Sequence, residues 1–101
     1  MAVTIVRYTT KPERAEENQA LIEAVFRELA ATDPAGLRYA SFRLDDGVSF
    51  VHVAEVTTSD GTNPLAATTA FQEFVREIAE RCVVAPVASS ATLVGAFRVG
   101  A

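Results

Sequence analysis

The chain has one histidine, and it lies in the stretch DDGVSFVHV, residues 45 to 53. Histidine is the side chain whose ordinary pKa lets it exchange a proton near neutral pH, so His52 is the first candidate for chemistry. No carboxylate or nucleophile stands in register with it. Two interpretations stay open: His52 handles a proton or polarises a ligand, or it makes a hydrogen bond within a subunit contact. No metal site is expected, because no Cys/His cluster has metal-ligand spacing.

Two arginines and two aromatic residues are expected near this histidine. Arg7 and Arg43 would flank Phe50 on neighbouring strands, where two cations could hold a carboxylate or a phenolate. The alternative is that both arginines pair with acidic groups such as Asp45 or a glutamate of a partner chain. The predicted ligand-binding site comprises Arg7, Tyr39, Arg43, Phe50 and His52. The lone Cys82 is predicted to be a core residue and not a nucleophile, since no second histidine or other base is visible near it.

The surrounding pattern predicts six elements in the order strand, helix, strand, strand, helix, strand. Residues 2–9 alternate as a strand, and Thr10 with Glu13 forms a capping box for a helix that ends near TDPAG. A hairpin turning at Asp46 and Gly47 follows. Asn63 and Pro64 should start a second helix with a stripe at Leu65, Phe71, Phe74, Val75, Ile78 and Cys82. VVAPVASS is expected to be a connection and ATLVGAFRV the last strand.

This order predicts an α+β, ferredoxin-like βαββαβ fold as a single domain over residues 1–101. A four-stranded antiparallel sheet would carry two helices on one face. The hairpin register places Arg38 opposite Glu55 and Ser41 opposite His52. Alternation then predicts a helix-facing side made of Val6, Tyr8, Ala40, Phe42, Leu44, Val51, Val53, Leu93, Gly95 and Phe97.

The other face of the sheet is expected to be open but too apolar for water. Its predicted members are Val3, Ile5, Arg7, Leu37, Tyr39, Ser41, Arg43, Val48, Phe50, His52, Ala54, Val56, Thr92, Val94, Ala96 and Arg98. A contiguous patch around Val3, Ile5, Phe50 and Val94 would be larger than monomeric proteins usually expose. The sequence therefore predicts a homodimer formed through the open sheet face.

Charge and composition exclude two classes of partner. The formal net charge is -4 and the pI is near 4.9, which leaves no electrostatic footprint for nucleic acid or anionic lipid. DGVSFVHV matches the RNA-recognition pattern at Gly47, Phe50 and Val51, but Asp46 replaces its basic residue and Val48 its first aromatic residue. The N-terminus lacks the pattern of a signal peptide, and Pro86 interrupts the most apolar stretch. We expect no nucleic-acid or membrane partner and a cytoplasmic location.

Three stretches carry a family resemblance: VTIVRYTTKPERAEENQALIEAVF, GVSFVHVAEVTT and AFQEFVREIAERC. Together they resemble the dimeric α+β-barrel group, which includes antibiotic-biosynthesis-monooxygenase-like proteins. The resemblance implies two subunits packed through their open sheet faces, with clefts between sheet and helices that bind aromatic substrates or haem. Its haem-degrading members use a helix histidine and a tryptophan, whereas this chain has no tryptophan and no histidine outside the third strand. No cofactor is expected, and no catalytic residue is carried over.

Three functions remain open at this level. The chain could be a cofactor-free, monooxygenase-like enzyme acting on a small aromatic or anionic molecule. It could also be a non-catalytic ligand-binding or stress-related dimer, or a structural dimer without a ligand. A hollow cleft beside Phe50, lined by Arg7, Tyr39, Arg43 and His52, would favour the first two. In such a cleft, burial and positive charge should lower the pKa of His52 below about 6.5.

Overall fold

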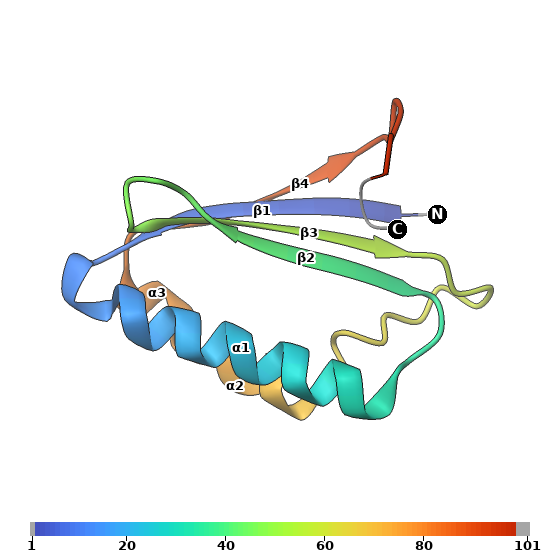
Figure 1. Cartoon of the computed structure of the whole chain (residues 1–101), viewed down its shortest axis with the longest axis horizontal. Helices are drawn as coiled ribbons and strands as arrows, with labels where there is room; N and C mark the ends of the chain where they lie inside the picture. Colours follow the sequence, from blue (N-terminus) through green and yellow to red (C-terminus); the bar gives the residue numbers. More distant parts are fainter. Residues whose placement is uncertain (1, 99–101) are drawn as a thin grey trace.

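A four-stranded antiparallel sheet in the order β2-β3-β1-β4 forms one layer of the molecule, and the helices cover one of its faces (Figure 1). The computed structural model describes residues 2–98. The elements are β1 (Ala2–Thr10), the 3-10 turn η1 (Pro12–Arg14), α1 (Ala15–Thr32), β2 (Leu37–Arg43), β3 (Ser49–Val56), α2 (Thr69–Val75), α3 (Ile78–Arg81) and β4 (Cys82–Ala91). The predicted ferredoxin-like α+β fold is confirmed.

Helix α1 presents an apolar stripe to the sheet, and Ile22 and Val25 of that stripe are buried. It ends at Asp33, which adopts a left-handed backbone conformation with φ of 45° just before Pro34. The predicted capping box is wrong. Thr10 is fully buried at the end of β1, and its hydroxyl donates to the carbonyl of Val48 at 3.1 Å. The chain instead enters α1 through η1.

The second helical segment is shorter than predicted and is broken in two. Asn63 accepts a hydrogen bond from the Leu65 amide in a turn, and α2 begins only at Thr69. Between α2 and α3, Glu77 has φ of 58°, which interrupts the helical path. Cys82 is the first residue of β4 and is half-buried against the core, so the expectation that it packs there is confirmed although it is not helical.

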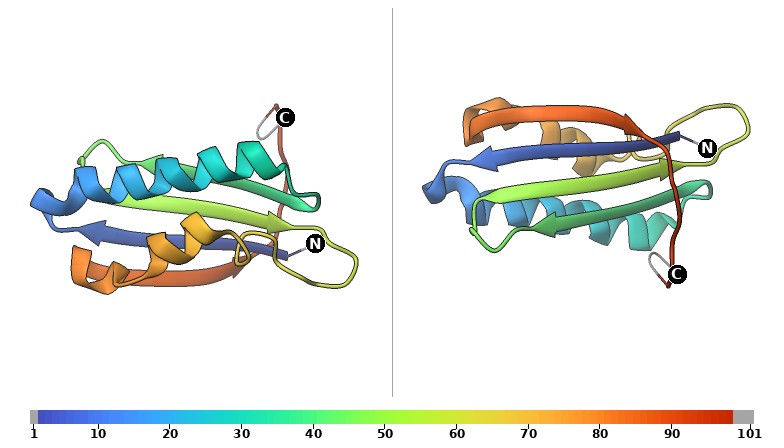
Figure 2. Two further views of the ribbon diagram at one scale, coloured as in Figure 1. Left: turned by 90° about the horizontal axis from the view of Figure 1, so that it is seen from below. Right: turned by 90° about the horizontal axis from the view of Figure 1, so that it is seen from above.

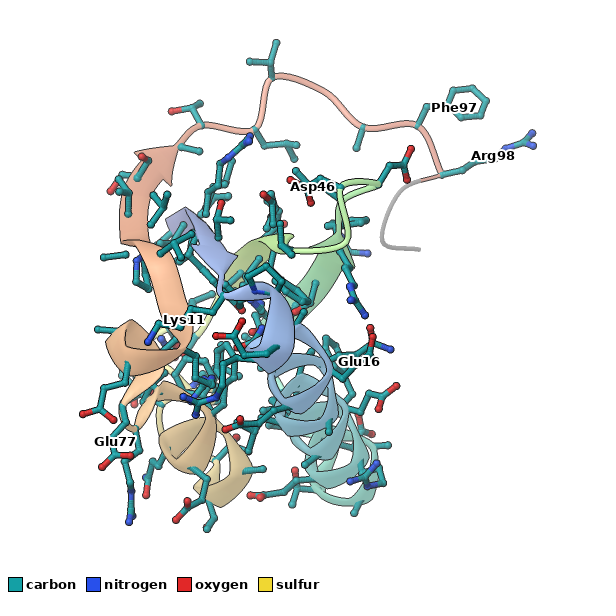
Figure 3. All side chains as sticks on the ribbon, turned by 90° about the vertical axis from the view of Figure 1, so that its left-hand side faces the viewer. Lys11, Glu16, Asp46, Glu77, Phe97 and Arg98 are labelled. Carbon is teal, nitrogen blue, oxygen red and sulfur yellow. The ribbon has the colours of Figure 1, made fainter. Side chains whose placement is uncertain are left out.

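The last strand lies earlier than predicted. Residues 82–91, most of which were expected to form a connection, are β4, which pairs antiparallel with β1. Pro86 suggested a break, but β4 is an edge strand of the sheet, where a missing N–H is tolerated. Residues 92–98, expected to be the strand, leave the sheet, and Figure 3 shows Phe97 and Arg98 on this tail, pointing away from the body of the molecule. Val94 is 99% exposed.

The hairpin register is confirmed, but its two faces are exchanged. Arg38 pairs with Glu55, Ser41 with His52 and Arg43 with Phe50, as predicted. However, β1 pairs with β3 so that Tyr8 lies opposite Phe50, and these two residues share the helix-facing side. The prediction misjudged the phase between β1 and the hairpin by one residue, and such a shift moves every side chain to the other face. Residues assigned to the wrong face are Leu37, Tyr39, Ala40, Ser41, Phe42, Arg43, Val51, Val53, Phe50, His52, Ala54 and Val56.

The core lies between the sheet and the helices. Its buried apolar members are Tyr8, Ile22, Val25, Phe50, Leu65 and Phe74. His52 is 4% exposed and lies within this layer, although it is polar. The other face of the sheet is open and carries no helix. In Figure 2 the view from below shows the helix-covered face, and the view from above shows the open face.

Candidate active site

A cavity of about 540 Å³ lies between the helix-facing side of the sheet and α2, next to the histidine. Its size falls within the range of small-molecule sites, which is about 300 to 1,000 Å³. Most of the wall is apolar, and the loop between β3 and α2 contributes Thr58, Gly61 and Asn63. The walls nearest the histidine come from Val6, Tyr8, Tyr39, His52, Phe71 and Phe74. The sheet thus supplies the polar end of the cavity, and α2 supplies an aromatic wall.

His52 is hydrogen-bonded through both ring nitrogens. Its Nε2 lies 2.7 Å from the Tyr8 hydroxyl, and its Nδ1 lies 2.6 Å from the Ser41 hydroxyl and 2.9 Å from the Tyr39 hydroxyl. The two tyrosine rings stack on the imidazole, with centroids 5.4 Å and 5.9 Å away. Strand alternation and register bring these four side chains together from β1, β2 and β3. The histidine is held in one orientation.

A chain of hydrogen bonds from the far side of the core sets the direction of these contacts. Arg81 Nε donates to Asn18 Oδ1 at 3.2 Å, and Asn18 Nδ2 donates to the Tyr8 hydroxyl at 2.8 Å. An arginine can only donate, so the amide of Asn18 has one possible orientation. Because Tyr8 oxygen accepts from Asn18, its own hydrogen is available for His52. With Asn18 as the donor, the Tyr8 hydroxyl can give its hydrogen to Nε2, and we adopt this neutral tautomer of His52, in which Nε2 accepts and Nδ1 carries the proton.

We call these hydrogen-bonded side chains the histidine cluster: Tyr8, Asn18, Tyr39, Ser41, His52 and Arg81. Burial controls the protonation of this cluster. It lowers the pKa of His52 from the ordinary 6.5 to about 4. Burial also raises the pKa of Tyr8 and that of Tyr39. A hydrogen bond acts in the opposite direction in each case, with Asn18 for Tyr8 and with Ser41 for Tyr39. The predicted lowering of the His52 pKa is confirmed, but burial causes it and the arginines do not contribute. At neutral pH the imidazole is uncharged, so Nε2 has a lone pair to offer.

Arg81 is a buried cation with neutral partners. It is 3% exposed, and its guanidinium donates to the carbonyls of Phe74 at 2.6 Å and Arg76 at 3.2 Å besides Asn18. It also lies 5.5 Å from the centre of the Phe74 ring. A positive charge in this position favours negative charge on nearby groups, and it opposes the upward shift of the Tyr8 pKa.

Only part of the predicted site is brought together. Tyr39 and His52 line the cavity, whereas Phe50 is buried beneath Tyr8, with ring centroids 5.6 Å apart. Arg43 lies 5.7 Å from the centre of the Phe50 ring but points to the outer side of α1, where it pairs with Glu16 at 2.9 Å. Arg7 pairs with Val51 in the β1–β3 register and so lies on the opposite face of the sheet. The prediction that both arginines flank Phe50 is wrong for Arg7.

Three members of the cluster were missed by the sequence prediction. Asn18 stands in helical register with Ile22, Val25 and Leu29, and a polar residue in an apolar stripe is a signal that could have identified it. Tyr8 was placed on the correct face but was not recognised as a hydrogen-bonding residue. Arg81 has no such signal, because its burial depends on the break between α2 and α3.

Two negative findings hold for the described part of the chain. Residues 2–98 contain no group of three or more His, Cys, Asp or Glu side chains that could hold a metal ion. Among the helices in that same range, none is both long and apolar enough to span a membrane.

Comparison with known proteins identifies the fold. No family model matches the chain, and no curated protein sequence matches it. The crystal structure of an antibiotic biosynthesis monooxygenase superposes with a TM-score of 0.74 and 20% identity, over 94% of this chain and 100% of that one. SnoaB, a cofactor-independent oxygenase from Streptomyces nogalater, gives 0.68 and 16%, over 96% of each chain. Rv0793 from Mycobacterium tuberculosis gives 0.73 and 14%, over 94% of this chain and 96% of that one. The chain thus has the fold of antibiotic-biosynthesis-monooxygenase-like proteins, as its sequence resemblance implied.

Proposed function

We propose that this chain is a cofactor-free oxygenase that binds a small, neutral hydroxyaromatic molecule in the cavity beside His52. The observation that carries the proposal is an apolar, aromatic-walled cavity whose polar end is the hydrogen-bonded pair Tyr8–His52, 2.7 Å apart. The structural likeness to an oxygenase that works without a cofactor supports the reaction class.

In the proposed reaction the substrate hydroxyl donates to the free lone pair of the Tyr8 oxygen. Proton transfer to Tyr8, with transfer of the Tyr8 proton to His52 Nε2, leaves a substrate anion and a neutral tyrosine. The anion then gives one electron to O₂, and the two radicals join in a C–O bond to give a peroxide anion. The peroxide takes up one proton, which replaces the one that the substrate gave up, and the resulting hydroperoxide loses water. The sum is hydroxyarene plus O₂ to quinone plus water, so no further reductant is needed.

The pKa of His52 restricts the substrate. A simple phenol has a pKa of about 10, roughly six units above the value of about 4 for His52, and that gap corresponds to about 8 kcal/mol. A hydroxyl acidified by a conjugated carbonyl group closes much of this gap. The proton balance therefore favours fused hydroxyaromatic ketones or quinones over simple phenols.

The cavity favours a neutral molecule over an anion. Its lining, taken over the described residues, includes no lysine or arginine, and His52 is neutral at ordinary pH. Arg7 and Arg43, which were expected to hold an anion, do not line this cavity. The anionic ligand is therefore the weaker of the two options.

A second candidate function is non-catalytic binding of the same class of molecule. Both ring nitrogens of His52 already have protein partners, which suits a rigid binding wall as well as a proton relay. This alternative covers the ligand-binding or stress-related dimer and differs from the oxygenase only in turnover. The purely structural dimer is less well supported, because it gives no role to a cavity of about 540 Å³.

The assembly proposed is a homodimer through the open sheet face. Ile5, Phe42 and Val87 lie on this face by the strand register and are 36%, 52% and 62% exposed. The composition of the patch differs from the prediction: Phe50 belongs to the core, and Phe42 takes its place. The tail residues Leu93, Val94 and Phe97 are also exposed and apolar, and a second subunit would offer them cover.

Oxygen uptake with a panel of hydroxynaphthoquinones and hydroxyanthrones tests the catalytic proposal. We expect turnover by the wild type without added cofactor and a loss of about 100-fold in kcat/KM in His52→Gln, the size typical of a removed general base. Arg27→Gln, an exposed change on α1 at a residue that lines neither this cavity nor the smaller one between α1 and β2, is the matched control and should keep full activity. Binding without oxygen uptake would replace the oxygenase by the binding protein, and full activity in His52→Gln would remove His52 from the mechanism.

A further inference from the structure

A second cavity, of about 310 Å³, lies on the other side of the histidine cluster, between α1 and β2. Glu23, Phe42 and Arg43 form part of its wall and are exposed, so water reaches it. The two cavities share no lining residue. They are separated by the layer of side chains that contains His52 and Ser41.

Ser41 connects these two spaces through the imidazole. Its hydroxyl lies 2.6 Å from His52 Nδ1, and Ser41 itself lines the second cavity. On the other side of the ring, His52 Nε2 contacts Tyr8, which lines the first cavity. A continuous line of hydrogen-bonding groups therefore runs from the ligand cavity through Tyr8, His52 and Ser41 to a recess with exposed walls.

The direction of the hydrogen bonds suits proton movement along this line. In the adopted tautomer the Tyr8 proton points at Nε2 and the ring proton lies on Nδ1, whose nearer partner is Ser41 at 2.6 Å and whose second partner is Tyr39 at 2.9 Å. A proton that enters at Nε2 can therefore leave from Nδ1 without any rotation of the ring. Rotation about the Cβ–Oγ bond of Ser41 turns its own hydrogen toward the second cavity.

We propose that Ser41 and the second cavity form a proton exit, through which the proton taken from the bound hydroxyaromatic molecule leaves to bulk water. This inference rests on the proposed function and makes Ser41 a positioning residue that acts through His52. The substrate proton moves to Tyr8, the Tyr8 proton to Nε2, the Nδ1 proton to Ser41 and the Ser41 proton to water. One O–H bond of the substrate breaks, one proton appears in the second cavity, and His52 ends as the other neutral tautomer, with its proton on Nε2. The same transfers in reverse return one proton to the peroxide and restore the starting tautomer.

Two further observations support an exit. Burial keeps the imidazolium unfavourable at neutral pH, so His52 passes a proton on more readily than it stores it. At the mouth of the second cavity, the exposed carboxylate of Glu23 supplies hydrogen-bond acceptors. The charge of Arg43 at this mouth is balanced by Glu16 at 2.9 Å, so it does not oppose the arrival of a proton.

The test uses 2-naphthol, a photoacid that becomes strongly acidic on excitation, as the bound probe. In the wild type we expect fluorescence from naphtholate within the complex, appearing more slowly in D₂O. In Ser41→Ala the naphtholate emission should fall to the level of His52→Gln, while the affinity for 2-naphthol stays within a few-fold. Ser41→Thr keeps a hydroxyl and should restore the emission, and Thr32→Val removes an exposed hydroxyl at the end of α1 as the matched control.

A second variant covers the possibility that Ser41→Ala does not fold. Gln19→Phe leaves the contact between Ser41 and His52 intact and fills the second cavity, so it should reduce the naphtholate emission in the same way. Naphtholate emission that is unchanged in Ser41→Ala or in Gln19→Phe, with 2-naphthol still bound, overturns the proton exit and leaves the proposed function standing. Absence of 2-naphthol binding to the wild type overturns both proposals.

Discussion

At the scale of single residues, His52 should make stability depend on pH. Its pKa of about 4 in the folded chain lies below the unfolded value of about 6.5, so below pH 6.5 the unfolded state binds the proton first. The stabilisation is complete above pH 6.5 and is lost as the pH falls to about 4. The shift corresponds to about 3 kcal/mol in the free energy of unfolding.

Denaturant unfolding between pH 7 and pH 4 measures this effect, with His52→Gln as the reference. The reference accounts for the carboxylates, which titrate in the same range in both proteins. We expect the difference between wild type and variant to shrink by about 3 kcal/mol on acidification. Parallel loss of stability in the two proteins would mean that His52 is not held neutral by burial.

Asn18 is the residue that sets the direction of the hydrogen-bond chain. Asn18→Ala would leave the buried guanidinium of Arg81 and the Tyr8 hydroxyl each without one partner, at a cost of about 1–3 kcal/mol. Arg27→Ala, an exposed change on the same helix, should cost less than about 0.5 kcal/mol. Thermal or urea unfolding of both variants checks the prediction, and equal stabilities would show that the network contributes little.

The site could be predicted from the sequence only where it depends on register within one hairpin. His52, Ser41 and Tyr39 were placed side by side correctly, because a tight turn fixes their alternation and pairing. The face of the sheet on which these residues lie could not be predicted, because both sides of β3 carry apolar residues. The polar histidine was therefore assigned to the open face. Arg81 and Asn18 join the site through packing between α1, α3 and β1, which a linear pattern does not encode.

At the scale of elements, the link from α1 to β2 depends on Gly36. This glycine has φ of 79°, and a Cβ built there would lie 2.6 Å from the side-chain methyl of Thr58. Gly36→Ala should therefore lower the free energy of unfolding by about 1–3 kcal/mol through backbone strain. The clash with Thr58 should lower it further. Gly61→Ala is a matched control, because Gly61 has φ of 78° with open space around its Cα. Equal losses in the two variants, measured by urea unfolding, would exclude the clash as a contributor.

The strand order was predictable from the sequence, while the position of the last strand was not. Both VVAPVASS and ATLVGAFRV are rich in residues that favour strands, and the proline suggested that the first was a loop. The position of α3 decides which of the two stretches forms the strand. Because α3 ends at Arg81, Cys82 lies next to β1 and the chain pairs with β1 from that residue on. Residues 92–98 remain as a tail after β4, and its apolar side chains Leu93, Val94 and Phe97 are exposed. A second subunit could cover them.

At the scale of the whole molecule, the open face should form a dimer interface. Ile5→Asp places a charge at a position that would be desolvated in the dimer, so it should yield a folded monomer. Phe50→Asp, by contrast, should unfold the chain, because Phe50 is 1% exposed and lies in the core. Light scattering and circular dichroism separate the two outcomes. A wild-type monomer at micromolar concentration would contradict the proposed assembly.

The single domain over residues 1–101 and the cytoplasmic location stay predictions.

A neutral hydroxyaromatic molecule should bind in the cavity against the Tyr8–His52 pair. The most direct test is ¹⁵N NMR of the His52 ring during a titration with 2-naphthol, with Ala54→Phe, which fills the cavity from its wall, as the control. We predict saturable shifts of the Nε2 and Nδ1 signals in the wild type and none in Ala54→Phe. Ring signals that stay unmoved up to millimolar 2-naphthol, or that move equally in the filled variant, would contradict binding at the Tyr8–His52 pair.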